Sequence, residues 1–326
     1  MTIQRLIFAP IRTILSRLSA AKYAAGIGMQ MRHARQRRHM VEGGPSGQSR
    51  AEHEFRVDLA LARAAALKAI HWTPDVVGER EIEQFMTGLQ VVDPGMSLIR
   101  IGGEADGGYL VPDDLEGITA CFSPGVAQEA TFEADLLDRG VRCHLIDGSV
   151  SSAPFEAENM TFERLFLGAH TKPGWTSLAD WVKRREPSDG ELILQMDIEG
   201  SEWSVLGGSD RSTLRRFRII VAELHDLHLL ATTAGMRRVQ DAFYALEADF
   251  DLVNIHPNNY EYPVDYRGVS LHPVVEATWL RKDRLLGHSA RHQPHPLERP
   301  NSPGFPDIPL DVRWYSHASR EGIERD

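Results

Sequence analysis

The stretch Glu191–Trp203, with the sequence ELILQMDIEGSEW, constrains the fold more than any other part of the chain. Leu192 to Met196 is a short apolar run, as expected of a strand buried on both faces of a parallel sheet. Asp197 and Glu199 follow directly, and in open α/β sheets ligands bind beyond the carboxyl ends of the strands. Two carboxylates at such a strand end are costly unless solvent, a cation or a ligand compensates them. The stretch therefore predicts either a ligand site or two acids that only favour the N-terminus of the next helix.

Similar apolar runs recur along the chain and alternate with segments of helical periodicity. The predicted strands are Ile118–Phe122, Val141–Ile146, Leu192–Met196, Phe217–Leu224, Asp251–Ile255 and Pro273–Leu280. Helices are expected between them, and Ser201 is the predicted N-cap of the helix after Glu199. Residues 148–176 show no regular pattern apart from the approach to a helix at Ser177–Arg185. This alternation favours one doubly wound, mostly parallel sheet.

The composition divides the chain into a basic arm and an acidic body. Residues 1–41 contain eight lysines and arginines and no acid, whereas the other 28 basic residues face 46 aspartates and glutamates. An acidic body argues against nucleic-acid binding, which needs clustered positive charge. Cys121 and Cys143 are too few for a disulfide framework and lie in apolar runs. They are therefore predicted to be buried free thiols in a reducing compartment, the cytoplasm.

The basic arm has the pattern of an amphipathic helix. Its apolar residues share one helical face: Ile7, Ile11, Ile14, Leu15 and Leu18. Such a helix can lie on an anionic membrane surface, which predicts a peripheral contact with the inner face of a membrane. The alternatives are a helix docked on a protein core or a poorly ordered arm. No run of about 18 apolar residues is present, so no segment is expected to span a bilayer.

The remaining boundaries follow from composition and periodicity. Residues 1–42 form the arm, and residues 43–50 are predicted to be a flexible glycine–serine linker. Residues 51–95 are expected to hold leading helices near 52–70 and at Glu79–Leu89. The main domain is predicted at 96–285, followed by a proline-rich extension at 286–326.

A glycine-rich loop precedes the first predicted strand of the main domain. The segment Arg100–Tyr109, RIGGEADGGY, places four glycines within seven positions. This density indicates a backbone that needs positive φ angles or a close approach to another group. Gly103 and Gly107 are therefore candidate cofactor contacts, with Asp106 facing a ligand amine. The alternative is an ordinary turn before a strand.

A second candidate cofactor loop follows the strand Ile118–Phe122. Ser123 and Gly125 begin the connection to the next strand, which ends in Asp147. An acid at this place holds ribose hydroxyls in nucleotide-binding folds. A single glycine does not make the G-x-G-x-x-G cradle for a pyrophosphate. A nucleoside without phosphates is therefore favoured over a dinucleotide.

Acids and histidines at several strand ends are candidate catalytic residues. His225 and His256 suit a general base because imidazole titrates near neutrality, with Asp197 or Glu223 orienting the ring. Alternatively Asp197, Glu223 and His225 bind a divalent cation that lowers the pKa of a hydroxyl. Each histidine taken alone is more simply a satisfied core or surface residue. The candidate substrate contacts are Glu199, Asn258, Asn259 and Glu276.

These motifs together resemble the FkbM-type methyltransferases, a class I family that uses S-adenosylmethionine. The most specific is MDIEGSEW at residues 196–203, and the subgroup motifs GGEADGGY, ELH, HPNN and VEAT occur at residues 102–109, 223–225, 256–259 and 275–278. The resemblance implies a Rossmann-like seven-stranded sheet with an antiparallel last strand. It also implies that Gly125 lies under the cofactor, that Asp147 holds its ribose, and that Asp197 lies beside its amino-acid end. Gln195 stands where the family pattern has a lysine.

The function expected from these residues is S-adenosylmethionine-dependent methyl transfer. The expected acceptor is a hydroxyl of a glycan, a lipid-linked sugar or a natural product, with a divalent cation as a further candidate cofactor. One alternative is a non-catalytic, membrane-tethered relative that binds a glycan or nucleoside. A third hypothesis is metal-dependent hydrolysis at the carboxylate and histidine strand ends.

Overall fold

The computed structural model describes residues 76–127 and 129–315. The basic arm, the glycine–serine linker and the helix predicted near 52–70 lie outside the described residues, so the membrane contact stays a prediction. The helix predicted at Glu79–Leu89 is confirmed as α3 (Glu79–Gly88). In the part of the chain that the structure describes, no helix combines the length and apolarity needed to cross a bilayer.

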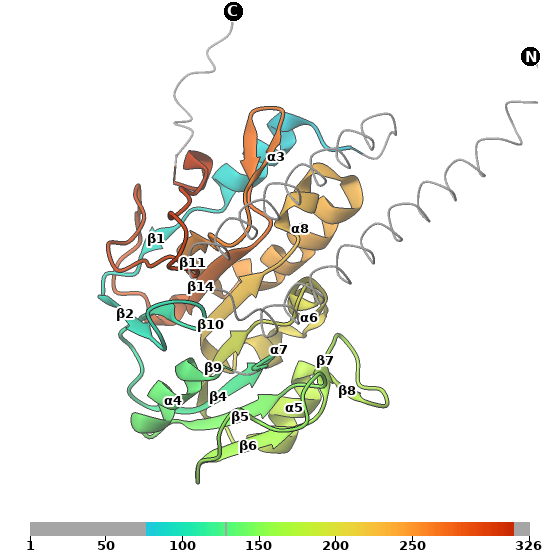
Figure 1. Ribbon diagram of the computed structural model, residues 1–326, viewed down its shortest axis with the longest axis vertical. Coiled ribbons are helices and arrows are strands. Elements are labelled where there is room, and N and C mark those ends of the chain that lie inside the picture. Colours follow the sequence, from blue (N-terminus) through green and yellow to red (C-terminus); the bar gives the residue numbers. More distant parts are fainter. Residues whose placement is uncertain (1–75, 128, 316–326) are drawn as a thin grey trace, which may run out of the picture. The chain divides into compact units, whose positions relative to one another are not determined.

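A seven-stranded sheet forms the centre of the fold, in the order β11-β14-β10-β9-β4-β5-β6 (Figure 1). The strands are β4 (Ile118–Pro124), β5 (Arg142–Ile146), β6 (Met160–Glu163), β9 (Glu191–Met196), β10 (Phe217–Leu224), β11 (Phe250–Pro257) and β14 (Val275–Arg281). Neighbours from β6 to β10 run parallel, and β14 runs antiparallel to both β10 and β11. The predicted mostly parallel sheet with an antiparallel last strand is confirmed.

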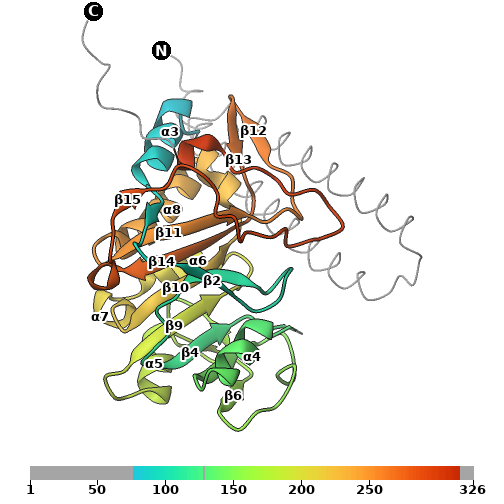
Figure 2. The same cartoon turned by 90° about the vertical axis from the view of Figure 1, so that its left-hand side faces the viewer.

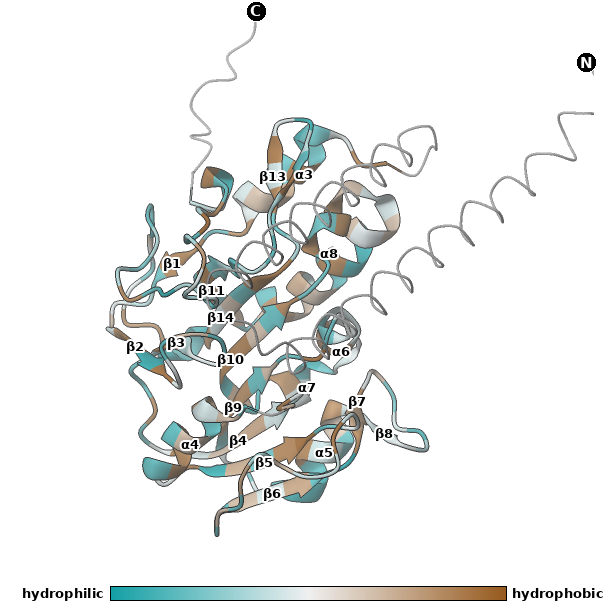
Figure 3. Cartoon of the chain, in the orientation of Figure 1, coloured by the Kyte–Doolittle hydropathy of each residue, from teal (hydrophilic) through white to brown (hydrophobic). Residues whose placement is uncertain are grey.

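The apolar runs became strands because both faces of the sheet are covered. Every residue of β10 and β14 is buried, and Figure 3 shows the hydrophobic residues concentrated along the central strands. Cys121 and Cys143 lie side by side on β4 and β5 as buried free thiols, as predicted. Strands buried on both faces need continuous apolar sequence, which is why these strands could be predicted from the sequence.

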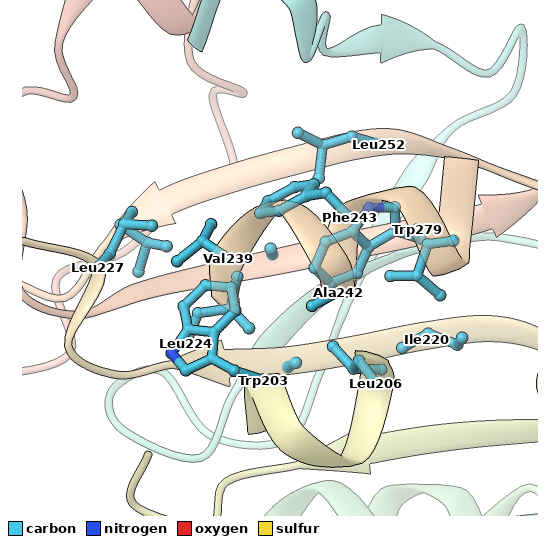
Figure 4. Packing of buried hydrophobic residues seen from close by; sticks show 14 of the residues in the cluster. Trp203, Leu206, Ile220, Leu224, Leu227, Val239, Ala242, Phe243, Leu252 and Trp279 are labelled. Carbon is cyan, nitrogen blue, oxygen red and sulfur yellow. The ribbon is translucent and has the colours of Figure 1, made fainter. Parts of the chain in front are cut away.

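Helices cover one face of the sheet through aromatic packing. They are α5 (Leu178–Arg185), α6 (Glu202–Gly208), α7 (Arg211–Leu214) and α8 (Thr233–Glu247). Phe243 of α8 contacts Trp279 of β14 with ring centroids 5.7 Å apart and lies 6.3 Å from Trp203 of α6 (Figure 4). Aromatic pairs of this kind contribute about 0.5–1.5 kcal/mol beyond their buried area. This packing fixes α6, and therefore the loop that precedes it, against β10.

The opposite face is covered by α4 (Thr131–Asp138) and by a hairpin of β2 (Leu98–Ile101) and β3 (Tyr109–Pro112) (Figures 1 and 2). Tyr109 packs edge-on against Phe132 of α4, with centroids 5.7 Å apart. The short remaining strands are β1 (Val92–Asp93), β7 (Phe166–Leu167), β8 (Trp175–Thr176), β12 (Val264–Tyr266), β13 (Val269–Leu271) and β15 (Ser289–Ala290). The 3₁₀ helices are η1 (Leu227–Ala231), η2 (Lys282–Arg284) and η3 (Val312–Trp314).

The structure corrects three local predictions. The segment 148–176 is not irregular throughout, because it contains the edge strand β6 and the β7–β8 pair. All four β6 residues are half-buried, so the strand lacks the apolar run that marks a central strand. The single helix predicted after Glu199 is broken into α6 and α7, since Asp210 caps a new helix by accepting from the backbone of Thr213. Ser201 is the N-cap of α6 by position, but its side chain makes no capping hydrogen bond.

Candidate active site

The ends of β9 and β10 bring five ionisable side chains into one cluster. The His225 cluster consists of Asp197, Glu199, Glu202, Glu223 and His225. Nε2 of His225 lies 3.8 Å from Asp197 Oδ1, 3.5 Å from Glu199 Oε2 and 3.9 Å from Glu223 Oε1. Its Nδ1 lies 3.1 Å from Glu202 Oε1. The predicted grouping of Asp197, Glu223 and His225 is thus present in the structure, with two further acids around the ring.

Backbone turns after the two strands place these side chains. Glu199 and Gly200 have φ angles of 56° and 96°, and Asp226 after β10 has φ 59°. Positive φ at a non-glycine residue is sparsely populated and persists only when the surroundings hold it. Trp203 of α6 supplies one such constraint, since its Nε1 donates to the carbonyl of His225 across 2.6 Å. The loops therefore hold Glu199 and His225 on the same side of the strand ends.

Burial and mutual charge shift the protonation of this cluster. Burial lowers the pKa of His225, but the carboxylates of Glu202, Glu223 and Asp197 outweigh it and hold that pKa well above its ordinary value. Burial raises the pKa of Glu223 well above its ordinary value, and the nearby Asp197 and Asp106 carboxylates add to the rise. Glu202 keeps a lowered pKa despite its burial, because His225 and the backbone N–H of Ile198 stabilise its charged form. The carboxylates around His225 therefore favour positive charge at this position.

A second cluster lies on the other side of β14. Glu276 of β14 is the register partner of Glu223 on β10 and of His256 on β11. The His256 cluster consists of His256, Glu276 and Glu298, each of which offers one ligand atom within 4.8 Å of the others. Burial raises the pKa of Glu276 to about 8. His225 and His256, both predicted as candidate bases, therefore belong to separate clusters, because β14 is inserted between β10 and β11.

The amides predicted to contact substrate have different positions. Asn258 donates to Glu223 Oε1 across 2.9 Å and so adjoins the His225 cluster. Asn259 is fully buried and donates to the carbonyls of Ser302, Phe305 and Pro306, while its Oδ1 accepts from the backbone of Ser302. The Asn259 side chain therefore holds the C-terminal segment 286–315 against the sheet.

The nucleoside side of the predicted site lies at the ends of β4 and β5. Asp147 is buried, and its Oδ2 accepts from the backbone of Ala127 across 2.9 Å. Its Oδ1 accepts from the backbone and hydroxyl of Ser149. A Cβ on Gly125 would lie 1.6 Å from the carbonyl oxygen of Asp197, so this position requires glycine for contact between two loops of the chain itself. Gly125 thereby brings the β4–α4 loop directly against the end of β9.

Ser123 points into the core rather than out of the loop. Its hydroxyl is fully buried and lies within hydrogen-bonding distance of Glu133 and, at 2.9 Å, of Gln195 Oε1. Nε2 of Gln195 donates to the Tyr109 hydroxyl across 3.3 Å. Burial raises the pKa of Glu133, and the hydrogen bond that its carboxyl oxygen accepts from the Ser123 hydroxyl opposes this rise. Gln195 therefore links the β4–α4 region to Tyr109 within a buried polar chain.

The glycine-rich loop is folded on itself between β2 and β3. Arg100 donates to the carbonyls of Gly103 and Ala105, at 2.8 and 3.0 Å. The backbone of Gly103 donates to Thr131 Oγ1, which in turn donates to the carbonyl of Gly107. The backbone N–H of Asp106 donates to the carbonyl of Asn301. The loop thus connects α4 to the C-terminal segment, and the Asp106 charge acts on Glu223.

Several residues in or beside the two clusters were not recognised in the sequence. Glu202 entered only as part of the MDIEGSEW motif, and Glu298, Asn301 and Asp307 come from the proline-rich extension. The GSE sequence after Asp197 was a usable signal for Glu202, since an acid in a first helical turn can reach back to the preceding loop. The acids and amide of residues 298–307 have no such local signal, because only tertiary contact brings them to the sheet.

Residues 142–252 match the family model described as the methyltransferase FkbM domain. The matched FkbM range runs from β5 to β11 and includes Asp147 and all five residues of the His225 cluster. The resemblance predicted from the sequence is confirmed over this range, and it supports a methyltransferase.

Comparison with curated proteins found no match. Among solved structures, a chain of a crystal structure of a fibrillarin/Nop5p complex matches with 16% identity and a TM-score of 0.33. The alignment covers 51% of this chain and 74% of that chain. A similarity this low carries no argument, so the fold assignment rests on the strand order and directions.

Proposed function

We propose that the protein is an S-adenosylmethionine-dependent methyltransferase that methylates a hydroxyl group with the help of a divalent cation. The FkbM match and the sheet topology support the methyltransferase part. The proposed cation ligands are Asp197, Glu199 and His225, whose ligand atoms lie within 4.8 Å of one another. Glu223 adjoins them and is held by Asn258.

The observation that carries the cation proposal is the arrangement around the His225 ring. The three carboxylate oxygens facing Nε2 are 3.5–3.9 Å away, beyond the usual N–H···O distance of about 2.7–3.2 Å. A cation about 2.0–2.2 Å from nitrogen and oxygen ligands fits between atoms at such separations. Nδ1 meets Glu202, and a carboxylate on the second ring nitrogen is the usual support of a metal-binding histidine. A mixed imidazole and carboxylate set favours Mn²⁺, Fe²⁺ or Zn²⁺.

The nucleoside side of the site fits S-adenosylmethionine in its chemistry. Asp147 lies at the end of β5 beside the β4–α4 loop, and its Oδ2 accepts one hydrogen bond in the described chain, which leaves capacity for a ribose hydroxyl. The residues that would hold the cofactor are Asp147 and the backbone of the Gly125 loop. When bound, the cofactor supplies a methyl group activated on a sulfonium.

The acceptor hydroxyl must lose its proton as the new C–O bond forms and the C–S bond breaks. A cation held by His225 and Asp197 lowers the pKa of a hydroxyl that binds to it. Glu199 is the most exposed acid of the cluster, with a side chain 48% exposed, so the proton can leave to solvent on its side. A cluster this rich in carboxylates suits a polyhydroxylated acceptor, which supports a glycan, a lipid-linked sugar or a natural product.

Turnover tests the proposal directly. The full-length protein would be incubated with S-adenosylmethionine, Mn²⁺ and a panel of hydroxylated sugars and glycolipids, and methylated product would be measured. His225→Ala removes a proposed cation ligand and is expected to lower kcat on the order of 10²-fold or more, since a catalytic cation contributes several kcal/mol of transition-state stabilisation. His288→Ala is the matched control, because this exposed histidine pairs only with Asp251 on the described surface. Full turnover after chelation, or in His225→Ala, would contradict the cation mechanism. Failure to bind S-adenosylmethionine would instead favour a non-catalytic relative.

A further inference from the structure

The His256 cluster joins three parts of the chain that are distant in sequence. His256 lies on β11, Glu276 lies on β14, and Glu298 belongs to the C-terminal segment 286–315. All three side chains are largely buried, with Glu276 5% exposed and the side chains of His256 and Glu298 4% and 7% exposed. Buried carboxylates need a compensating cation, complete hydrogen bonding or a bound proton.

One ring nitrogen of His256 faces a carboxylate but makes no hydrogen bond. Its Nε2 lies 3.3 Å from Asp307 Oδ1 and is the nitrogen that donates to this carboxylate. Nδ1 finds no hydrogen-bond partner within the described ranges, although Glu298 Oε2 lies 3.8 Å away. At 3.8 Å these two atoms are too far apart for a hydrogen bond. A metal ion bound to both atoms fits the separation.

The oxygen donors of the cluster are held in place from outside it. Asn254 donates to Glu298 Oε1 across 2.6 Å, which leaves Oε2 toward the histidine. Asn301 donates to Glu276 Oε1, while its own buried Oδ1 has no hydrogen-bond partner in the described chain. Arg100 acts electrostatically on Glu276, and Glu298 acts on Arg291. No described ion pair joins either arginine to its glutamate. The carboxylate oxygens are therefore oriented, and among residues 76–127 and 129–315 no positive side chain other than the His256 ring pairs directly with them.

We propose that His256, Glu276 and Glu298 bind a second divalent transition-metal ion that fastens the C-terminal segment to the sheet. The imidazole nitrogen selects Zn²⁺, Mn²⁺ or Fe²⁺ over Ca²⁺ and Mg²⁺, which prefer oxygen ligands alone. Asn301 Oδ1 is a candidate additional oxygen ligand. The site is separate from the His225 cluster, and its occupancy does not depend on methyl transfer.

Zinc titration of matched variants tests the proposal without any assay of turnover. The purified full-length protein, stripped with chelator, would be titrated with Zn²⁺ by calorimetry in a His225→Ala background. This variant is expected to bind one equivalent, and His225→Ala with Glu298→Gln is expected to bind at least tenfold more weakly. His225→Ala with His288→Gln is the control and should still bind one equivalent of Zn²⁺.

Glu298→Gln keeps an oxygen that can accept from Asn254, so the fold is expected to survive, and circular dichroism checks this. Limited proteolysis gives a second readout. Zn²⁺ should protect residues 286–315 in His225→Ala but not in His225→Ala with Glu298→Gln. Undiminished zinc binding in the Glu298→Gln double variant, or no zinc binding in the His225→Ala background, would overturn the second site. Neither result would bear on whether the protein transfers methyl groups.

Discussion

Glu202 accepts a hydrogen bond from Nδ1 of His225 across 3.1 Å. The same Glu202 oxygen accepts from the backbone N–H of Ile198 across 2.9 Å, so one carboxylate ties the loop after β9 to the end of β10. Because Nδ1 carries its proton toward Glu202, Nε2 is the ring atom that faces Asp197 and Glu199. This relationship orients the candidate catalytic ring and leads to the first prediction.

Glu202→Gln should lower activity and metal affinity about 10–100-fold, the usual cost of removing the acid that supports a metal-binding histidine. A neutral amide no longer strengthens the ring as a ligand or specifies its tautomer. Steady-state kinetics with Mn²⁺ titration would measure the change. Ser201→Ala is the matched control, because the Ser201 side chain makes no capping hydrogen bond. Equal activity in both variants would show that Glu202 is only structural.

Asp147→Ala should weaken S-adenosylmethionine binding by about 1.5–3 kcal/mol, the value of a hydrogen bond to a charged group. Calorimetric titration would measure the affinity. Ser149→Ala is the control, because it removes the hydroxyl that donates to Asp147 Oδ1 and leaves the carboxylate in place. An Asp147→Ala variant that retains its thermal midpoint and full cofactor affinity would remove Asp147 from the site.

Gln195→Met should destabilise the protein by about 1–3 kcal/mol, because it leaves a buried hydroxyl without its hydrogen-bond partner. That hydroxyl belongs to Tyr109, 3.3 Å from Gln195 Nε2, whereas Ser123, 2.9 Å from Gln195 Oε1, keeps its hydrogen bond to Glu133. Urea unfolding would measure the loss. Tyr109→Phe and the double variant complete a cycle, and a coupling free energy near zero would show that the Gln195–Tyr109 contact contributes nothing.

His272 should make stability fall in acid. Burial lowers its pKa to about 4, with Asp311 opposing the change and His256 adding to it, and neither ring nitrogen has a hydrogen bond among the described residues. The unfolded chain takes up a proton below its usual pKa of about 6.5, whereas the folded chain does not until about pH 4. Stability from this group is therefore complete above pH 6.5 and is lost as the pH falls through this window. The loss amounts to about 3 kcal/mol at 1.36 kcal/mol per pKa unit.

Urea unfolding of wild type and His272→Leu at pH 7 and at pH 4.5 would check this expectation. The variant should lose less stability between the two pH values, since it has no ring to protonate. His288→Leu, at an exposed position, should behave as the wild type. Identical pH dependence in wild type and His272→Leu would contradict the assignment.

Much of the fold could be predicted because its signals are local. Strands buried on both faces require continuous apolar runs, and β9 and β10 show them plainly. The half-buried edge strand β6 has no such run, and its pairing with β5 supplies what its own sequence lacks. The break between α6 and α7 depends on the Asp210 side chain, which caps a new helix. Apolar periodicity does not predict this break.

The candidate site was also predicted only in part. Asp197 and His225 were predicted to meet because the carboxyl ends of adjacent parallel strands share one edge of the sheet. His225 and His256 looked equivalent in sequence, each following an apolar run, yet β14 separates their strands and places them in different clusters.

The sequence by itself determined the sheet, its parallel direction and the acids at the strand ends, since apolar periodicity and strand polarity are properties of short segments. Only the tertiary structure decided that Glu202 supports His225 and that Glu298 reaches His256. Glu298 lies 42 positions beyond His256, in a proline-rich segment without periodicity. Its position depends on the hydrogen bonds that hold this segment to the sheet, above all those of Asn259. Contacts of that range follow from packing of the whole domain, which no local pattern encodes.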